Sequence, residues 1–285
     1  MIDASPPDLA LRGMESDDLA RAHALSRALQ WPHRAEDWDF LLQRGWGVVA
    51  ERDGEVVGTA MAWPFGPKAA TLGMVIVARE AQGMGVGRRL MQAVLDGLGD
   101  RTVMLHATAE GLPLYRTLGF EPAGTILQHQ GAAFSVPLPE LLPDERVRPL
   151  GASDTDTIVD LDRRATGMDR GELLQVLAEQ SQGVVLTRGH EPVGFALFRR
   201  FGRGYVVGPT VAPDLGGAKA LISHWLGSNA GMFCRLDVPD DCGLPGWLDG
   251  LGLQCVGRVT RMVRGKALPR DPAARTFSLV TQALG

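Results

Sequence analysis

The spacing of apolar and polar residues predicts a chain that alternates between helices and strands. Residues 46–63 form two apolar runs around Asp53-Gly54, a dipeptide typical of a tight turn between antiparallel strands. Residues 16–44 have a mostly helical pattern with a break near Trp31-Pro32. Residues 74–77 have the composition of a buried strand, and the apolar positions of residues 88–98 recur on one helical face.

The same kind of pattern continues downstream. Residues 102–107 predict another strand, and residues 112–119 predict a short helix with Pro113 in its first turn and Gly119 at its C-terminal cap. Residues 120–136 predict a closing pair of strands. The expected order is therefore helices, hairpin, strand, helix, strand, helix and strand pair.

Three glycines lie where the strand at residues 74–77 gives way to the helix at residues 88–98. Gly83, Gly85 and Gly87 have no side chains to obstruct an anion, and glycine tolerates positive φ. A helix N-terminus presents unpaired N–H groups and the positive end of the helix dipole. Arg88 and Arg89 add positive charge directly after the loop. The junction therefore predicts a phosphate-binding site.

Spacing distinguishes among the loops that bind phosphate. A Walker loop requires Gly-Lys followed by Ser or Thr, whereas Gly87 is followed by two arginines. A dinucleotide fingerprint requires another glycine three residues after the second, and neither Gly85 nor Gly87 has one. Residues 82–87 instead read Gln-x-x-Gly-x-Gly, which resembles the pyrophosphate arm of the GNAT superfamily of acyl-CoA-dependent N-acyltransferases.

A second motif carries the same resemblance. Tyr115 to Phe120 is similar to the Tyr-x-x-x-Gly-Phe segment of the GNAT family, and the chain contains only 2 tyrosines, which disfavours a role in packing alone. When an amine attacks a thioester the leaving group is a thiolate, and a phenol with a pKa of about 10 can donate a proton to it. Tyr115 is therefore the predicted general acid.

The resemblance implies acetyl-CoA as the cofactor and assigns its contacts. The backbone of Val75 and Val77 would hold the pantetheine arm as an added strand. The pyrophosphate arm would lie on the loop formed by Gln82, Gly83, Met84, Gly85, Val86, Gly87 and Arg88. Many relatives have an asparagine seven residues before the tyrosine that touches the cofactor. Here that position is Thr108, so this contact departs from the family pattern.

The chain repeats itself at a nearly constant offset. Residues 190–196 match residues 54–60 with a shift of 136, residues 210–214 match 76–80 with a shift of 134, and residues 251–253 match 118–120 with a shift of 133. A length of 285 residues also favours two domains, and the proline-rich stretch 137–146 marks the boundary. We expect a catalytic domain at residues 1–138 and a second domain at residues 144–285. The expected fold class is α/β: two tandem GNAT folds, each a central mixed, mostly antiparallel sheet flanked by helices.

The second copy lacks the residues that carry the chemistry. Its loop after Val211 is shorter and has no Gln-x-x-Gly-x-Gly pattern, and Leu248 stands at the tyrosine position. This half resembles the degenerate GNAT-like C-terminal domain of some tandem bacterial acetyltransferases. We expect it not to transfer acyl groups, and to serve in acceptor recognition or dimerisation, so that a second copy of the chain is one expected partner.

Candidates for the acceptor site follow from the family geometry. Trp31 and His33, beside the break between the first helices, are expected to wall the pocket, unless Trp31 is a core anchor and His33 a solvated loop residue. His106 is the first candidate for the base, directly or through water, with Glu110 as its competitor. Asp237 either binds a cationic acceptor or initiates a turn before Pro239.

Composition narrows the function classes. A net charge of −4 without a long Lys/Arg cluster disfavours nucleic acid, and no apolar run approaches the length of a membrane span. The N-terminal residues do not resemble a secretion signal. The 3 cysteines, at positions 234, 242 and 255, have no metal or disulfide spacing, so we expect no metal and a reducing cytoplasm.

The prediction as a whole is an acetyl-CoA-dependent N-acetyltransferase that acts on a small-molecule amine. Direct attack is preferred because the first half has no cysteine to carry an acyl intermediate. The alternative is an acyl-CoA sensor that binds the cofactor without turnover.

Overall fold

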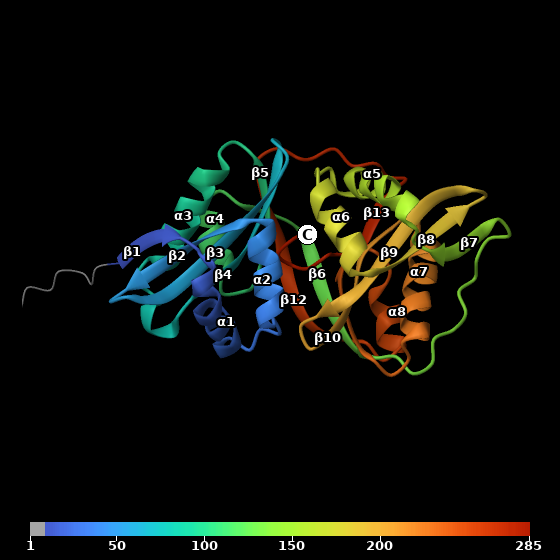
Figure 1. Cartoon of the computed structure of the whole chain (residues 1–285), viewed down its shortest axis with the longest axis horizontal. Helices are drawn as coiled ribbons and strands as arrows, with labels where there is room; N and C mark the ends of the chain where they lie inside the picture. The colour runs from blue at the N-terminus through green and yellow to red at the C-terminus, as the bar shows by residue number, and fades with distance from the viewer. Residues whose placement is uncertain (1–8) are drawn as a thin grey trace, which may run out of the picture.

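The computed structural model describes residues 9–285, which form two similar halves side by side (Figure 1). The elements of the first half are β1 (Leu9–Gly13), α1 (Leu19–Ala28), α2 (Ala35–Arg44), β2 (Trp46–Arg52), β3 (Glu55–Phe65), β4 (Ala69–Val77), α3 (Val86–Leu98), β5 (Thr102–Ala107), α4 (Leu112–Thr117) and β6 (Glu121–Ala132). Those of the second half are β7 (Glu145–Pro149), α5 (Thr155–Thr166), α6 (Gly171–Gln180), β8 (Gln182–Arg188), β9 (Glu191–Phe201), β10 (Gly204–Ala212), α7 (Leu215–Ser228), β11 (Phe233–Pro239), α8 (Pro245–Gly250), β12 (Gln254–Arg264) and β13 (Arg275–Ser278).

Most predicted elements of the first half are confirmed. β2 and β3 form the antiparallel hairpin, and Asp53 and Gly54 both have positive φ, as a two-residue turn of this kind requires. The break at Trp31-Pro32 separates α1 from α2. The apolar face of α3 is buried through Leu90, Met91 and Val94, as its periodicity predicts.

The predicted strand pair at residues 120–136 is wrong. β6 is a single strand, and both of its neighbours belong to the second half: β12 on one side and β11 on the other. β12 in turn pairs with β5, so that Thr260 lies opposite Ala107. The polarity pattern predicts that these residues are extended, but it does not say which strand pairs with them.

The exchange of β6 and β12 makes one continuous sheet. Among residues 9–285 it has 13 strands in the order β1-β2-β3-β4-β5-β12-β6-β11-β10-β9-β8-β7, with β13 paired to β10. Figure 1 shows β12 and β6 crossing the middle of the molecule, where the chain also ends. The largest apolar cluster crosses the same boundary, since Trp63 and Leu90 belong to it together with Leu174 and Phe195. The halves are therefore repeats of one fold but share a sheet and a core.

Local details are repeated as well. Arg12 binds Asp18 at 2.7 Å at the start of the first half, and Arg148 binds Asp154 at 2.6 Å at the start of the second. The second pair lies 136 residues after the first, the same shift that relates residues 190–196 to residues 54–60. In each case the aspartate also accepts a backbone N–H, from Glu15 or Gly151, and so caps the turn that leads into the first helix.

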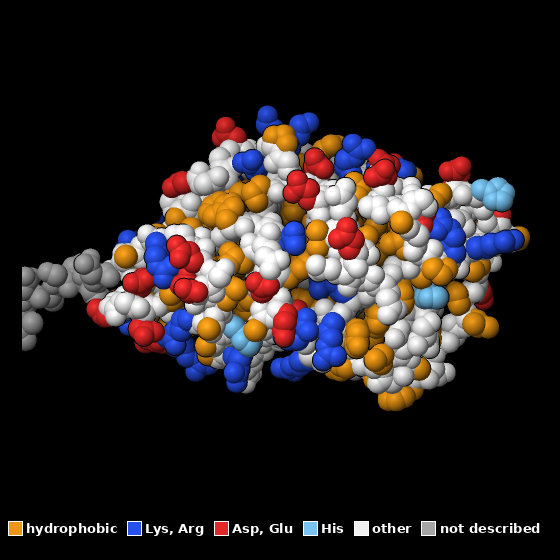
Figure 2. Space-filling model, viewed as in Figure 1, with side chains coloured by type: hydrophobic (Ala, Val, Ile, Leu, Met, Phe, Trp, Pro, Cys, Tyr) orange, Lys and Arg blue, Asp and Glu red, His pale blue; other side chains and the backbone are white. Residues whose placement is uncertain are grey.

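The surface is mixed in charge. Figure 2 shows basic and acidic side chains interspersed over one face of the molecule. None of the helices in the described part of the chain is long and apolar enough to cross a bilayer.

Candidate active site

In the first half, β4 and β5 pair only at their start and then diverge. Parallel pairing joins residues 69–71 of β4 to residues 102–104 of β5. From Leu72 to Val77 the edge of β4 that faces β5 has no strand partner among residues 9–285. A register shift against β3 and a φ of 53° at Met74 mark a bulge where the strands separate. Backbone groups on this edge are therefore available to a ligand that binds as an added strand.

The glycine loop lies at the end of this open edge. Gly83 and Gly85 have φ of 77° and 78°, and Gly85 is the N-cap of α3. No neighbouring atom lies within 4 Å of the place where a side chain would begin on either residue. The N–H groups of Val86, Gly87 and Arg88 form the first turn of α3 and have no acceptor within the helix. The loop thus offers exposed N–H groups at a helix N-terminus, which fits the pyrophosphate of acetyl-CoA.

Side chains brace this loop from both ends. Gln82 donates its Nε2 proton to the carbonyl oxygen of Val77 at 3.1 Å, which ties the loop to β4. Arg88 donates from Nη2 to Oγ1 of Thr117 at 2.7 Å, which ties α3 to α4. Val75 and Val77 are half-buried on the open edge, and Met84 is exposed. The side chain of Gln82 therefore helps to position the loop.

Tyr115 lies on α4 with a buried ring and an unpaired hydroxyl. Its ring packs edge-on against Phe120 at 6.2 Å and closely against Gly111. The hydroxyl has no hydrogen-bond partner within the described residues, and it is not among the fully enclosed polar atoms. Burial raises the pKa of Tyr115 to about 12, so the phenol keeps its proton across the physiological range. A protonated hydroxyl of this kind can act as a proton donor.

A cavity of about 380 Å³ adjoins the divergence of β4 and β5. It brings together four of the predicted site residues, namely Trp31, His33, His106 and Thr108. The second half completes the wall with Phe201, Arg235, Arg258 and Gln282. We call this cavity the interdomain pocket; its volume lies within the range of small-molecule sites.

His106 is held in one tautomer by the second half. Its Nδ1 lies 2.7 Å from the carbonyl oxygen of Gln282, and a carbonyl only accepts, so Nδ1 carries the proton. Nε2 therefore has a free lone pair; it is enclosed and has no partner within residues 9–285. Burial lowers the pKa of His106 to about 4, which keeps the ring neutral at pH 7. Nε2 is enclosed, so a water molecule or an acceptor reaches it only when neighbouring side chains move.

His33 and Trp31 lie between the two halves. His33 packs edge-on against Phe201 at 5.6 Å and lies 5.8 Å from Trp31, ring centre to ring centre. Burial lowers the pKa of His33 to about 4. His33 is therefore not a solvated loop residue, and the turn at Phe201 forms the opposite wall of the pocket. Glu110, the competing base, is exposed and does not line the pocket.

Asp237 lies in the middle of β11 and is fully buried, so the expectation that it initiates a turn is wrong. Arg235 binds both of its oxygens, at 2.8 and 2.9 Å, and Gln282 donates from Nε2 to Oδ1 at 2.8 Å. Its carboxylate does not line the pocket, and its charge is already paired. Asp237 thus offers a cationic acceptor no free oxygen; it holds Arg235 and Gln282, which do line the pocket.

In the second half the equivalent opening is closed by the chain itself. β10 and β11 pair only at residues 205–206 and 234–235 before they diverge. β13 then pairs with β10 from Thr210 to Ala212, and the N–H of Leu279 donates to the carbonyl oxygen of Asp237 on β11. Ser278 Oγ bonds Thr210 Oγ1 at 2.9 Å at the same place. Leu248, at the tyrosine position, is fully buried. Within residues 9–285, the divergence of β10 and β11 therefore leaves no open edge for a pantetheine arm.

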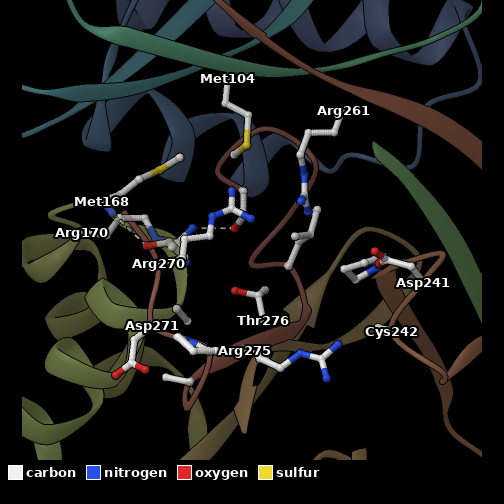
Figure 3. A pocket seen from close by; sticks show the side chains of 17 residues that line it. Met104, Met168, Arg170, Asp241, Cys242, Arg261, Arg270, Asp271, Arg275 and Thr276 are labelled. Carbon is white, nitrogen blue, oxygen red and sulfur yellow. Dashed lines mark hydrogen bonds between the residues drawn. The ribbon is translucent and has the colours of Figure 1, made fainter. Parts of the chain in front are cut away.

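A second cavity of about 360 Å³ lies between the halves and is rich in arginine. Figure 3 shows Arg170, Arg261 and Arg270 around this space, with Arg275 below them. Arg170 is paired with buried Asp162 at 2.6 Å. Met104 is the one described residue of the first half that lines this cavity, whereas the interdomain pocket reaches the open edge of β4 at Gly73 and Met74.

The sequence analysis does not predict the residues that the second half contributes to the interdomain pocket. Arg235 lies two positions from Asp237 on one strand, so the period of 2 could have indicated that they share a face. Phe201 and Gln282 have no comparable signal, because both reach the pocket only through the packing of one half on the other.

The open edge of β4 runs from the interdomain pocket, at Gly73 and Met74, to the glycine loop at the start of α3. This arrangement suits an enzyme that transfers an acyl group from coenzyme A. Residues 15–120 match the model of the acetyltransferase (GNAT) family, and residues 158–278 match that of an acetyltransferase (GNAT) domain. The chain therefore belongs to the GNAT acetyltransferases and carries two such domains in tandem.

Individual relatives agree with this assignment. An uncharacterized N-acetyltransferase of Bacillus subtilis, YitH, is 28% identical over 216 residues, which cover 74% of this chain and 75% of the relative. The holothin acyltransferase of a Pseudoalteromonas species is 26% identical over 266 residues and 88% of each chain. A tandem GNAT protein from the clavulanic acid biosynthesis pathway has the same fold, with a TM-score of 0.61 at 14% identity over 91% of this chain and 100% of its own.

Proposed function

We propose that the protein is an acetyl-CoA-dependent N-acetyltransferase that acetylates a primary amine of a small molecule by direct attack. The observation that carries this proposal is the open edge of β4, which connects the glycine loop to the interdomain pocket. When bound, acetyl-CoA supplies an activated acetyl thioester. The first half alone has the strand edge, loop and tyrosine that this cofactor requires.

The reaction moves two protons, one to the leaving sulfur and one from the amine, and the site has a residue for each transfer. The amine nitrogen forms a bond to the carbonyl carbon of the thioester, and the carbon–sulfur bond breaks. Tyr115 donates its phenolic proton to the departing sulfur. The proton lost by the amine passes through a water molecule to Nε2 of His106, whose Nδ1 proton is held by Gln282. Backbone groups of Val75 and Val77 position the pantetheine arm. Thr108 lines the interdomain pocket together with His106.

The test is CoA release with a panel of amines, compared between the natural chain and Tyr115→Phe. Free CoA should be measured by chromatography, because exposed Cys255 would react with a thiol reagent. We expect kcat to fall about 100-fold in the variant, the lower range for a general acid, with KM for acetyl-CoA unchanged. Thermal stability should hardly change, since the hydroxyl has no partner within the described chain.

Unchanged turnover in Tyr115→Phe would contradict the proposed mechanism. Calorimetric binding of acetyl-CoA without CoA release, across primary amines of both high and low basicity, would support a sensor instead of an enzyme.

A further inference from the structure

The interdomain pocket has no group that would pair with an ammonium ion. None of the described residues that line it is Asp or Glu, whereas Arg235 and Arg258 both line it. His33 and His106 are kept neutral by burial. A cationic acceptor would therefore meet the positive charge of Arg258 and the ion pair of Arg235 with Asp237, and no free carboxylate among the described lining residues.

Arg235 is built as a fixed hydrogen-bond donor. Arg235 lines the pocket and is only 8% exposed. Its guanidinium lies 5.5 Å from the ring centre of Phe201. Nε and Nη2 are committed to Asp237. Nη1 has no partner within residues 9–285, yet it is not among the fully enclosed polar atoms. The residue thus keeps one donor group free and immobile at the pocket wall, which suits an oxygen acceptor.

Part of the pocket wall is apolar and aromatic. Trp31, Phe201 and Val259 all line it. An acceptor with a flat ring or an apolar body makes the most favourable contacts with such a wall.

The weak basicity of His106 restricts the amine further. A base with a pKa of about 4 is far too weak to deprotonate an alkylammonium ion, whose pKa is about 10, to any useful extent. An amine that is already neutral at pH 7 needs no stronger base.

Resting on the proposed function, we infer that the acceptor is a weakly basic amine on an apolar or aromatic body, with a carboxylate or carbonyl oxygen that Arg235 binds. The recognition residue comes from the second half, and Asp237 is its positioning residue. The degenerate half thus selects the substrate of the catalytic half.

The experiment compares kcat/KM for five amines at pH 7 with saturating acetyl-CoA. Aniline, 3-aminobenzoate and 3-aminobenzamide share one body and differ in the oxygen group, whereas benzylamine and putrescine are strongly basic. We expect both oxygen-bearing anilines to exceed aniline at least tenfold, and both basic amines to fall below it.

The variant Arg235→Lys keeps the charge beside Asp237 but removes the free Nη1 donor. It should reduce the preference for the oxygen-bearing anilines to less than threefold, mainly through KM. Arg200→Lys is the matched control, because Arg200 is exposed on β9 and does not line the pocket. If Arg235→Lys fails to fold, the double variant Arg235→Met/Asp237→Leu removes both charges of the buried pair and should abolish the same preference.

Faster turnover of putrescine or benzylamine than of 3-aminobenzoate would overturn the inference, as would an unchanged preference in the Arg235 variants. Absence of CoA release with every amine would instead overturn the proposed function, and the acceptor class with it.

Discussion

At the scale of single residues, the candidate site uses acids and bases that burial keeps uncharged. Tyr115 has its pKa raised to about 12, and the pKa of both His33 and His106 is lowered to about 4. A neutral phenol can donate a proton, and a neutral imidazole can accept one. The burial that keeps these groups neutral also makes the phenol a weaker acid and the imidazoles weaker bases.

Neutral histidines also make stability depend on pH. A histidine with a pKa near 4 in the folded state and about 6.5 when unfolded binds more protons in the unfolded chain between these values. Stability should therefore fall as pH falls from 6.5 toward 4. We expect a lower thermal midpoint at pH 5 than at pH 7.

The variant His33→Leu should show a smaller drop between pH 7 and pH 5, measured by circular dichroism. The matched control is His190→Leu, because His190 is exposed in a turn of the second half. An equal drop in the natural chain, His33→Leu and His190→Leu would contradict the buried neutral state of His33.

A site residue can be predicted from the sequence when the residues that it acts with are close to it in the chain. Gln82 to Arg88 and Tyr115 lie in short motifs, so their place at a helix end and on a short helix could be read from spacing. The sequence does not predict that the carboxylate of Asp237 is buried and paired, because strand pleating brings Arg235 to it and the path of the last residues brings Gln282. No local pattern contains that information.

At the scale of elements, the two halves differ in what occupies the divergence of their central strands. In the first half the edge of β4 stays open, whereas β13 fills the corresponding place in the second half. The opening beside β4 is free for a cofactor arm, whereas the backbone of β13 fills the opening beside β10. The missing glycine loop in the second copy predicts that this half does not transfer acyl groups, but only the structure shows the replacement strand.

The glycine loop provides a prediction at this scale. Gly85 has a φ of 78°, so Gly85→Ala strains the backbone by about 1–2 kcal/mol even though its Cβ meets no atom within 4 Å. If the loop relaxes away from this conformation, acetyl-CoA should bind about 5- to 30-fold more weakly, as measured by calorimetry.

Gly189→Ala is the matched control, since Gly189 has a φ of 64° and open space around it in the second half. It should cost similar stability but leave acetyl-CoA binding unchanged. Equal weakening by both variants would contradict the assignment of the loop at residues 82–88.

At the scale of the whole molecule, the halves are joined more closely than a tandem repeat requires. The exchange of β6 and β12 places a strand of each half inside the sheet of the other. The largest core cluster also spans both halves. The repeat itself could be predicted from matching segments, but the exchange could not, because equivalent strands from either half satisfy the same pattern.

This arrangement predicts that the first half does not fold alone. A chain of residues 1–138 would lose β12, leaving β5 and β6 with unpaired backbone edges that favour aggregation. We expect this fragment to be insoluble or to lack a cooperative thermal transition, and the full chain to unfold in one transition. A soluble, cooperatively folded fragment that binds acetyl-CoA would contradict the structural dependence.

The central claim is that a chain with two copies of the fold holds one cofactor site. Calorimetric titration with a non-transferable thioether analogue of acetyl-CoA measures this directly. The account predicts one site per chain, weakened by Gly85→Ala and unaffected by Gly189→Ala. Two sites per chain, or one site that persists unchanged in Gly85→Ala, would contradict it.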